Sequence, residues 1–248
     1  MTRFIMLIGL PGSGKSTYVL NNIKENEVYL SSDEIREELY GNESIQDNPA
    51  KVFDLMYKRT IDALLNNQTV YYDATNINRK KRIHTLSQLK HKIKDLDCQG
   101  ILFATPYEEC LKRNQLRNRN VPEEAIKRMY MSFNVPSTRE GFNNIKIIYP
   151  EDFNKDVIVI DRINALKRFN QETKHHSNTL GDHMYNAFTY LIKNYPKHTL
   201  RLRYATLLHD LGKPFTKSFY NSKGELTENA HYYSHDKVGA YEFILTVP

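Results

Sequence analysis

The stretch that most constrains this chain is residues 3–17, RFIMLIGLPGSGKST. An apolar run, Phe4 to Ile8, is short enough for a buried strand, and it leads directly into a segment that fits G-x-x-x-x-G-K-[S/T]. Glycines permit positive φ, so several backbone N–H groups can converge on phosphate oxygens. A helix that begins near Lys15 would direct its positive dipole end at the same anion. We therefore predict a nucleoside triphosphate site rather than an ordinary glycine-rich turn.

Each side chain of this loop has an expected task. Lys15 is expected to reach the β- and γ-phosphates of ATP, and the Ser16 hydroxyl is expected to bind Mg²⁺. The predicted nucleotide-binding residues are Gly9, Pro11, Gly12, Ser13, Gly14, Lys15, Ser16 and Thr17.

Composition sets broad limits on the rest of the chain. Its 248 residues suffice for one large domain or two modest ones. No apolar run approaches the roughly 20 residues of a membrane span, and the first strand is too short for a signal peptide. Cys98 and Cys110 have no metal-binding spacing, so a reduced, cytoplasmic setting is the simplest interpretation. The formal charge of +6 suits a polyanionic partner, although many proteins of this charge bind no nucleic acid. The sequence does not indicate the oligomeric state.

The first half of the chain alternates between strand and helix patterns. Strands are expected at Val28–Leu30, Thr69–Tyr72 and Gln99–Ala104, and late strands at Ile145–Tyr149 and Val157–Ile160. Helical patterns lie between them, which indicates an α/β fold with a parallel sheet flanked by helices. Ligands of such sheets bind at the carboxyl ends of the strands.

The second half has a different pattern. Helices are expected at residues 180–194, 200–211 and 234–245, so we expect a small all-α domain there. The predicted domains are residues 1–162 and 163–248.

Two charged residues follow the second predicted strand. Asp33 lies at a strand end, where a carboxylate can orient and deprotonate an acceptor hydroxyl near the γ-phosphate. The alternative is that Ser32 or Asp33 only caps the next helix. Arg36, one helical turn later, could hold an anionic part of the acceptor or could be a solvated surface residue.

A basic segment follows the fourth predicted strand. Arg113 and Arg117 are four residues apart and are expected on one helix face, before a polar loop at Asn118–Asn120. This pattern is typical of a mobile lid whose guanidinium groups neutralise the transferring phosphoryl group, although a solvated basic face would have the same pattern. The charge run Arg79–Arg82 is usually a solvated face, and it could instead follow a nucleic-acid backbone.

The stretches GLPGSGKST, SSDEIR, YYDATN and CLKRNQLRNRNVPEEAIKRMY resemble the phage-type polynucleotide 5′-kinase family, in order and spacing, over residues 1–150. The resemblance implies a P-loop kinase fold and the transfer of the ATP γ-phosphate to 5′-OH ends of RNA or DNA. It implies that Lys15 and Ser16 hold ATP·Mg²⁺ and that Asp33 is the general base. Arg36 would grip the acceptor's neighbouring phosphate, Asp73 would line the acceptor or metal side, and Arg113 and Arg117 would be the lid arginines.

Histidines gather in the second half of the chain. His183, His209-Asp210 and His235 lie on or near separate predicted helices. Imidazole and carboxylate groups from different helices can converge on a divalent transition metal that activates water, although an adjacent His-Asp pair is also a common accident.

The context LLHDLGKP, with a histidine upstream and S-H-D-x-x-G-A downstream, resembles the HD phosphohydrolase superfamily, especially the variety found beside tRNA nucleotidyltransferase domains. The resemblance implies that His183, His209 and Asp210 are metal ligands, that His235 is a further ligand or phosphate contact, and that a complete domain removes 3′-phosphates. The family also supplies an aspartate from a later helix, and none follows here, so we expect an incomplete HD-like domain and weak hydrolysis.

The leading hypothesis is therefore a nucleic-acid end-healing kinase. A small-molecule kinase that acts on a nucleoside or sugar is the first alternative, and a nucleotide-sensing module without enzymatic activity is the second. The sequence does not separate RNA from DNA as the acceptor.

Overall fold

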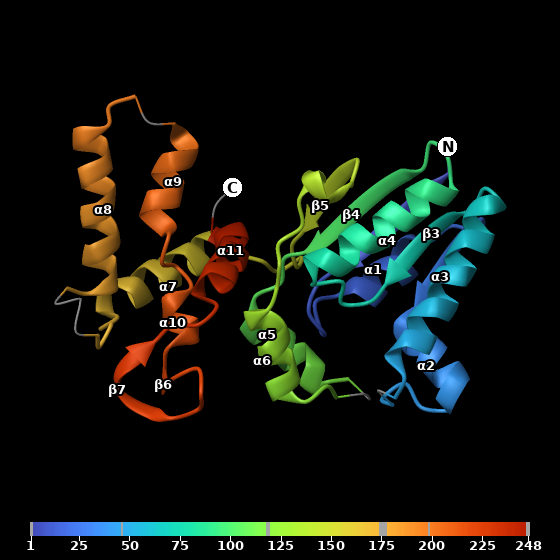
Figure 1. Cartoon of the computed structure of the whole chain (residues 1–248), viewed down its shortest axis with the longest axis horizontal. Coiled ribbons are helices and arrows are strands. Elements are labelled where there is room, and N and C mark those ends of the chain that lie inside the picture. The colour runs from blue at the N-terminus through green and yellow to red at the C-terminus, as the bar shows by residue number, and fades with distance from the viewer. Residues whose placement is uncertain (1, 46, 118–119, 174–177, 198, 247–248) are drawn as a thin grey trace. The chain divides into compact units, whose positions relative to one another are not determined.

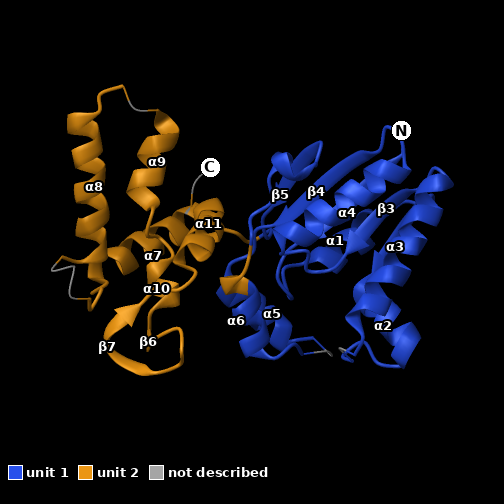
Figure 2. Cartoon of the chain, in the orientation of Figure 1, with its two compact units in different colours: residues 1–129, 134–151 blue, residues 130–133, 152–248 orange. Residues whose placement is uncertain are grey.

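The computed structural model describes residues 2–45, 47–117, 120–173, 178–197 and 199–246. The chain forms two compact units (Figure 2). The first consists of residues 1–129 and 134–151, and the second of residues 130–133 and 152–248. The domain boundary predicted at residues 162/163 falls inside helix α7 (Lys155–Arg168).

A five-stranded sheet forms the centre of the first unit (Figure 1). Its strand order is β2-β3-β1-β4-β5, and every neighbouring pair is parallel. The strands are β1 (Arg3–Ile8), β2 (Glu27–Ser31), β3 (Thr69–Asp73), β4 (Asp97–Phe103) and β5 (Asn144–Ile148). The predicted parallel α/β fold is confirmed.

Helices cover both faces of this sheet, which explains why the central strand is apolar throughout. All residues of β1 from Phe4 to Ile8 are buried. Ile5 and Leu7 pack with Val19 of the first helix, so the alternate residues Phe4, Met6 and Ile8 lie against the opposite face. The helices of the first unit are α1 (Lys15–Asn22), α2 (Ser32–Tyr40), α3 (Pro49–Leu65), α4 (Arg79–Lys92), α5 (Tyr107–Gln115), α6 (Glu123–Met131) and the 3₁₀ turn η1 (Thr138–Glu140).

Helix α6 passes from the first unit into the second, because residues 130–133 cluster with the second unit. Tyr130 and Phe133 are buried there and pack edge-on against the ring of Tyr241. The Tyr130 hydroxyl donates to Glu242, a fully buried carboxylate that also accepts from Arg162 at 2.7 Å. Pairing of this kind is what makes a buried carboxylate tolerable.

The second unit is mostly helical, as expected, with one β-hairpin that the sequence analysis missed. Its elements are α7 (Lys155–Arg168), α8 (Leu180–Asn194), α9 (Leu200–Leu208), α10 (Lys213–Thr216), β6 (Ser218–Tyr220), β7 (Leu226–His231) and α11 (His235–Thr246). The hairpin turns at Gly224, whose φ of 81° is accessible to glycine at little cost. The polar run Asn221–Gly224 was its signal in the sequence.

The strand predicted at Val157–Ile160 is wrong, because these residues lie within α7. The Asn154 side chain accepts a hydrogen bond from the backbone N–H of Val157 and caps the helix. Lys167 and Arg168 in the last turn complement the helix dipole. Among the described residues, no helix has the length and apolar character needed to cross a lipid bilayer.

Candidate functional site

The phosphate loop lies between β1 and α1, and two of its glycines have backbone conformations that other residues rarely adopt. Gly12 has φ 78° and Gly14 has φ 95°. A Cβ atom at Gly12 would lie 2.4 Å from the carbonyl oxygen of Cys110, so the loop packs directly on the backbone of α5. At Gly14 the nearest atom is Nη1 of Arg113, at 3.9 Å from a hypothetical Cβ. The loop therefore forms a cradle, and the side chain of Arg113 faces it.

Lys15 is buried beneath this cradle. Its Nζ donates to the carbonyl oxygens of Gly9 at 3.1 Å and Leu10 at 2.9 Å. Burial lowers the pKa of Lys15 from its ordinary value, while the carboxylates of Asp73 and Asp33 act in the opposite direction. A bound triphosphate would supply the negative charge that a buried ammonium group requires.

Asp73 joins the loop to the neighbouring strands. Its Oδ2 accepts from the Ser16 hydroxyl at 2.9 Å and from the Tyr29 hydroxyl at 2.7 Å. Burial, together with the charge of Asp73, raises the pKa of Tyr29. Hydroxyl and carboxylate oxygens are the ligands that Mg²⁺ prefers, so the pair of Ser16 and Asp73 suits that ion. Sequence reasoning missed Tyr29, because no motif marks it and only the pairing of β2 with β3 brings it beside Asp73.

The loop also has an unmet hydrogen-bonding requirement that fits a phosphate. Ser13 Oγ is buried, and it is one of a few buried side-chain atoms in the described residues that have no hydrogen-bond partner. Buried hydroxyls normally have a partner, and a phosphate oxygen in the cradle would provide one. The residues present therefore fit ATP·Mg²⁺, with Lys15 and the loop on the phosphates and Ser16 and Asp73 on the metal side.

Asp33 and Arg36 form an ion pair at the start of α2, where Arg36 Nη1 lies 2.6 Å from Asp33 Oδ1. The predicted helix cap at Ser32 or Asp33 is wrong, because the Ser31 side chain caps the helix and accepts from the N–H of Asp33. Asp33 is thus in the first turn with a partly exposed carboxylate, whereas Arg36 is buried. Asp33 follows the carboxyl end of β2, which lies at the same edge of the parallel sheet as the end of β1 that leads into the phosphate loop.

The predicted lid arginines occupy different positions. Arg113 lies within α5, where its Nε forms an ion pair with Glu109 at 2.7 Å and its Nη1 faces Gly14. Arg117 lies beyond the end of α5 at Gln115, so the expectation of one shared helix face is wrong. Burial is the main cause of the lowered pKa of Lys15, and the charge of Arg117 lowers that pKa further. Arg117 therefore lies near the phosphate loop. Asn118 and Arg119, in the predicted polar loop, lie outside the described residues.

Asn114 connects the end of α5 to the start of the next segment, and sequence reasoning missed it. Its side-chain amide donates to the carbonyl oxygen of Val121 at 2.8 Å and accepts from the Val121 N–H at 3.1 Å. This two-point contact closes the loop that carries Arg117. An asparagine next to the last residue of a basic helix was the available signal.

The charge run at the start of α4 is only partly a solvated face. Arg82 is fully buried and contacts both carboxylate oxygens of Glu140, at 2.7 and 2.9 Å. Its Nη1 also donates to the carbonyl oxygen of Asn76 at 2.9 Å. Asn76 in turn donates to Leu7 at 2.7 Å. Arg82 therefore supports the carboxyl edge of the sheet, where Asp73 lies.

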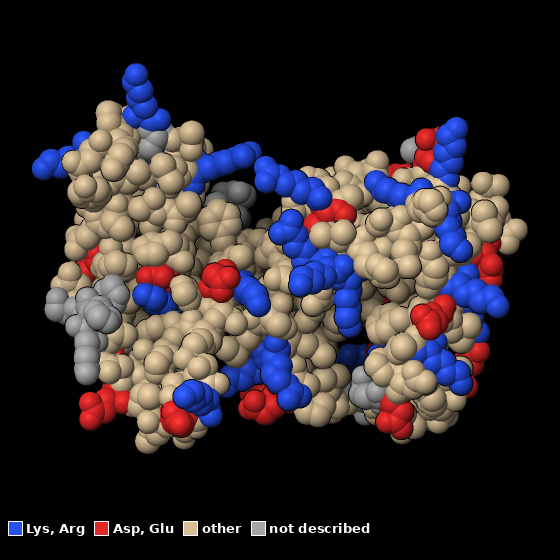
Figure 3. All heavy atoms as spheres, in the orientation of Figure 1, with Lys and Arg blue, Asp and Glu red and all other residues tan. Residues whose placement is uncertain are grey.

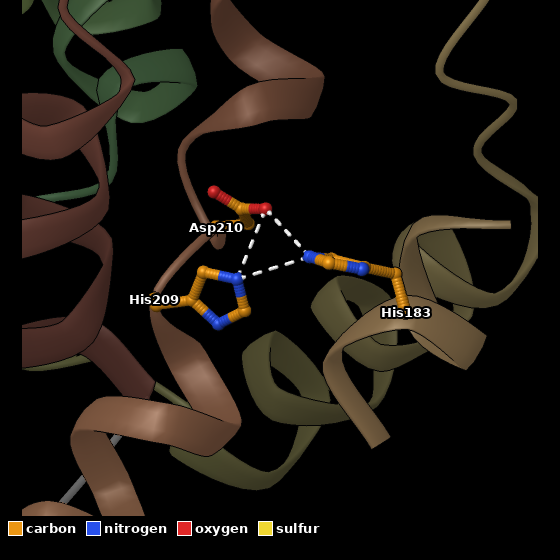
Figure 4. Close-up of side chains that lie close together, drawn as sticks. All are labelled: His183, His209 and Asp210. Atoms are coloured by element: carbon orange, nitrogen blue, oxygen red, sulfur yellow. Dashed lines mark hydrogen bonds and ion pairs between the residues drawn. The ribbon is translucent and has the colours of Figure 1, made fainter. Parts of the chain in front are cut away.

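A second cluster lies in the second unit. The side chains of His183, His209 and Asp210 come from α8 and the end of α9, and they point toward one centre (Figure 4). The two Nε2 atoms are 3.2 Å apart, and they lie 3.6 and 3.2 Å from Asp210 Oδ2. The donor atoms all fall within 4.8 Å of one another, and the mix of nitrogen and oxygen donors fits a divalent transition metal.

Neighbouring groups surround the carboxylate of this cluster. Lys213 Nζ lies 2.7 Å from Asp210 Oδ2, and His235 Nε2 lies 3.6 Å from Oδ1. Burial alone would raise the pKa of Asp210, but hydrogen bonds from His209 and Lys213 hold it well below its usual range. The contact with Asp210 also raises the pKa of His209. His235 reaches Asp210 but lies outside the three-residue group.

Comparisons with known proteins identify several to which this chain is similar. A curated L-seryl-tRNA(Sec) kinase of Methanococcus maripaludis is 31% identical over 146 residues, which are 56% of this chain and 55% of that protein. The chain thus spans about half the length of this relative. Among solved structures, the Pnkp1/Rnl/Hen1 RNA repair complex is 25% identical over 53% of this chain and 43% of its own, with a TM-score of 0.45. A fungal RNA kinase is 16% identical over 83% of this chain and 95% of its own, with a TM-score of 0.42.

The family described as AAA domain matches residues 4–136, which include the phosphate loop, Asp33, Asp73, Arg113 and Arg117. Membership implies ATP, and usually Mg²⁺, as ligands. Since the match covers more than half of the chain, the chain belongs to this family, and its first unit is a P-loop kinase domain.

Proposed function

We propose that the first unit is a polynucleotide 5′-hydroxyl kinase that transfers the γ-phosphate of ATP to RNA or DNA ends. The observation that carries the proposal is that Asp33 follows β2 and Lys15 follows β1 at the carboxyl edge of one parallel sheet, because phosphoryl transfer needs a group that orients and deprotonates the acceptor next to the phosphate site. The motifs SSDEIR and YYDATN, which resemble the polynucleotide kinase family, contain Asp33, Arg36 and Asp73.

The other residues would divide the remaining work. Lys15 and Arg113 would neutralise charge on the transferring phosphoryl group, and Arg117 would join them from the lid. Ser16 and Asp73 would hold Mg²⁺. Arg36 would fix the carboxylate of Asp33 through their ion pair and contact the acceptor's neighbouring phosphate.

A second candidate is the phosphorylation of a hydroxyl carried by an aminoacyl-tRNA. It is favoured by the 31% identity with a protein named L-seryl-tRNA(Sec) kinase. Both candidates require a nucleic-acid acceptor, whereas a small-molecule kinase does not.

The test is incubation with ATP labelled at the γ-phosphate and a panel of acceptors. The panel contains a nucleoside, a nucleoside 3′-phosphate, single-stranded RNA and DNA with 5′-OH ends, and seryl-tRNA. Label on oligonucleotide 5′ ends, with an acceptor KM that rises with salt, supports the proposal. Label on the serine of seryl-tRNA alone supports the second candidate, and label on the nucleoside alone contradicts both.

We also propose that the second unit has an HD-like phosphohydrolase site in which His183, His209 and Asp210 hold a divalent transition metal. The distances among their donor atoms support this assignment. The ion would supply an activated water for attack on a 3′-phosphate, and His235 would contact the ion or the phosphate. Titration of the whole chain with Mn²⁺ should show a site that is present in the wild type and absent from the His183→Ala variant. Equal Mn²⁺ binding by the variant would contradict the ligand set.

A further inference from the structure

The hairpin formed by α8 and α9 has an unusual charge distribution. Between Asp182 and Asp210 the sequence has 27 residues and no acidic side chain. The Lys and Arg residues of this segment, named here the basic hairpin (residues 183–209), are Lys193, Lys197, Arg201 and Arg203. Figure 3 shows blue atoms and no red ones over the outer ends of α8 and α9, at the upper left of the view. This one-sided charge is complementary to a polyanion.

The basic hairpin also exposes large aromatic side chains. Tyr185, Tyr190 and Tyr195 are 57–62% exposed, and the rings of Tyr190 and Tyr195 are 6.4 Å apart. Every residue of α9 is at least partly exposed, including Leu200 and Leu202. Aromatic faces beside cations are the combination on which unpaired bases stack while their phosphates contact the charges.

Tyr190 and Lys193 of α8 lie along the same helix as His183 of the histidine cluster. His183 and Tyr190 are seven residues apart, so they lie on nearly the same face of α8, about 10 Å apart along its axis. Lys193 follows almost one turn later, at the outer end of the helix. A strand that stacks a base on Tyr190 and contacts Lys193 would therefore extend along α8 with one end close to His183.

We propose that the basic hairpin binds single-stranded nucleic acid and directs its 3′ end to the cluster of His183, His209 and Asp210. The inference rests on the function proposed for the second unit, since it identifies how a strand with a 3′-phosphate is held at that site. Tyr190 and Tyr195 stack bases, and Lys193 and Arg201 contact phosphates. An acidic protein would satisfy the charges of the basic hairpin but would not explain the exposed aromatic faces.

The first experiment measures binding of a 3′-phosphorylated single-stranded oligonucleotide to the whole chain by fluorescence anisotropy. Tyr190→Ala should weaken binding by about 5- to 150-fold, the usual effect of losing one base stack. The double charge reversal of Lys193 and Arg201 to Glu should lower the salt slope of log K by about 1.4 or more, because each phosphate contact contributes about 0.7 on a single strand. The matched control changes Tyr220 and Lys223, an exposed aromatic and an exposed cation on the β6–β7 hairpin, to Ala and Glu.

The second experiment determines which end of the strand is bound. A photoreactive base at the 3′-terminal position should crosslink to the peptide that contains residues 180–209, and the same base at the 5′ end should not. Phosphorylation of a nucleoside 3′-phosphate, measured on the same variants, reports whether the kinase unit is intact. If 5′-kinase activity is absent but the 3′ crosslink forms, only the proposed kinase function fails.

Two results would overturn the inference. One is binding by the Tyr190→Ala and charge-reversal variants that equals binding by the control variant. The other is a set of crosslinks from the 3′ end that map outside residues 180–209.

Discussion

Replacing Asp33 by Asn separates catalysis from helix stabilisation, because the structure assigns the helix cap to Ser31 instead. Asp33→Asn should lower kcat by about 10²-fold or more, as expected for the loss of a general base. A 10²-fold loss corresponds to about 2.7 kcal/mol of activation free energy. The Asp33 carboxylate is partly exposed, Asn keeps a side-chain oxygen that can accept from Arg36, and Arg36 also donates to the Ser32 carbonyl oxygen. The substitution should therefore cost about 1 kcal/mol of stability, which leaves nearly all molecules folded.

Ser31→Ala is the matched control. It removes the hydrogen bond to the N–H of Asp33, which costs about 1 kcal/mol of stability, and it should leave kcat close to the wild-type value. Steady-state kinetics with a 5′-OH oligonucleotide and chemical denaturation, carried out on both variants, give the comparison. If Asp33→Asn keeps more than a tenth of the wild-type kcat, or if both variants lose kcat equally, Asp33 is not the base.

Four other substitutions test the rest of the site. Lys15→Ala should abolish phosphoryl transfer, and retention of more than a tenth of the wild-type rate would contradict the assignment of the loop. Arg113→Ala should slow the chemical step in single-turnover experiments by about 10²-fold. Arg36→Ala should instead raise the KM for the acceptor and leave the KM for ATP unchanged. Equal effects of the two substitutions on ATP binding would contradict these separate roles. Arg82→Met should cost about 3–5 kcal/mol of stability in urea unfolding, because it leaves Glu140 buried and unpaired, and changing Glu140 to Met as well should restore much of the loss.

The sequence predicts the sheet well because its strands carry strong local signals. The apolar run at Phe4–Ile8 and the glycine loop after it can form little other than a buried strand and a phosphate cradle. Val157–Ile160 was misinterpreted because four consecutive β-branched residues favour a strand by propensity, whereas the cap at Asn154 stabilises a helix.

The parts of the site that depend on distant pairing were not predictable. Tyr29 reaches Asp73 across 44 residues, and Arg82 pairs with Glu140 across 58 residues, so no local pattern shows either contact. Arg82 lies in a run of four cations, and only the fold distinguishes the buried member from the exposed ones. The sequence also did not show that α5 ends at Gln115, so it did not predict that Arg117 lies beyond the helix.

The passage of α6 from one unit into the other affects how the chain can be divided. A fragment cut at the end of the first unit, after Glu151, would include Tyr130 and Phe133 without the residues that bury them. Exposed aromatic side chains of this kind promote aggregation, so poor solubility of such a fragment would say nothing about its catalytic residues. A cut that removes residues 130–133 is not an alternative, because the chain returns to the first unit at Asn134 and goes on to β5. The two units are therefore best separated by inactivating substitutions in the whole chain rather than by shortening it.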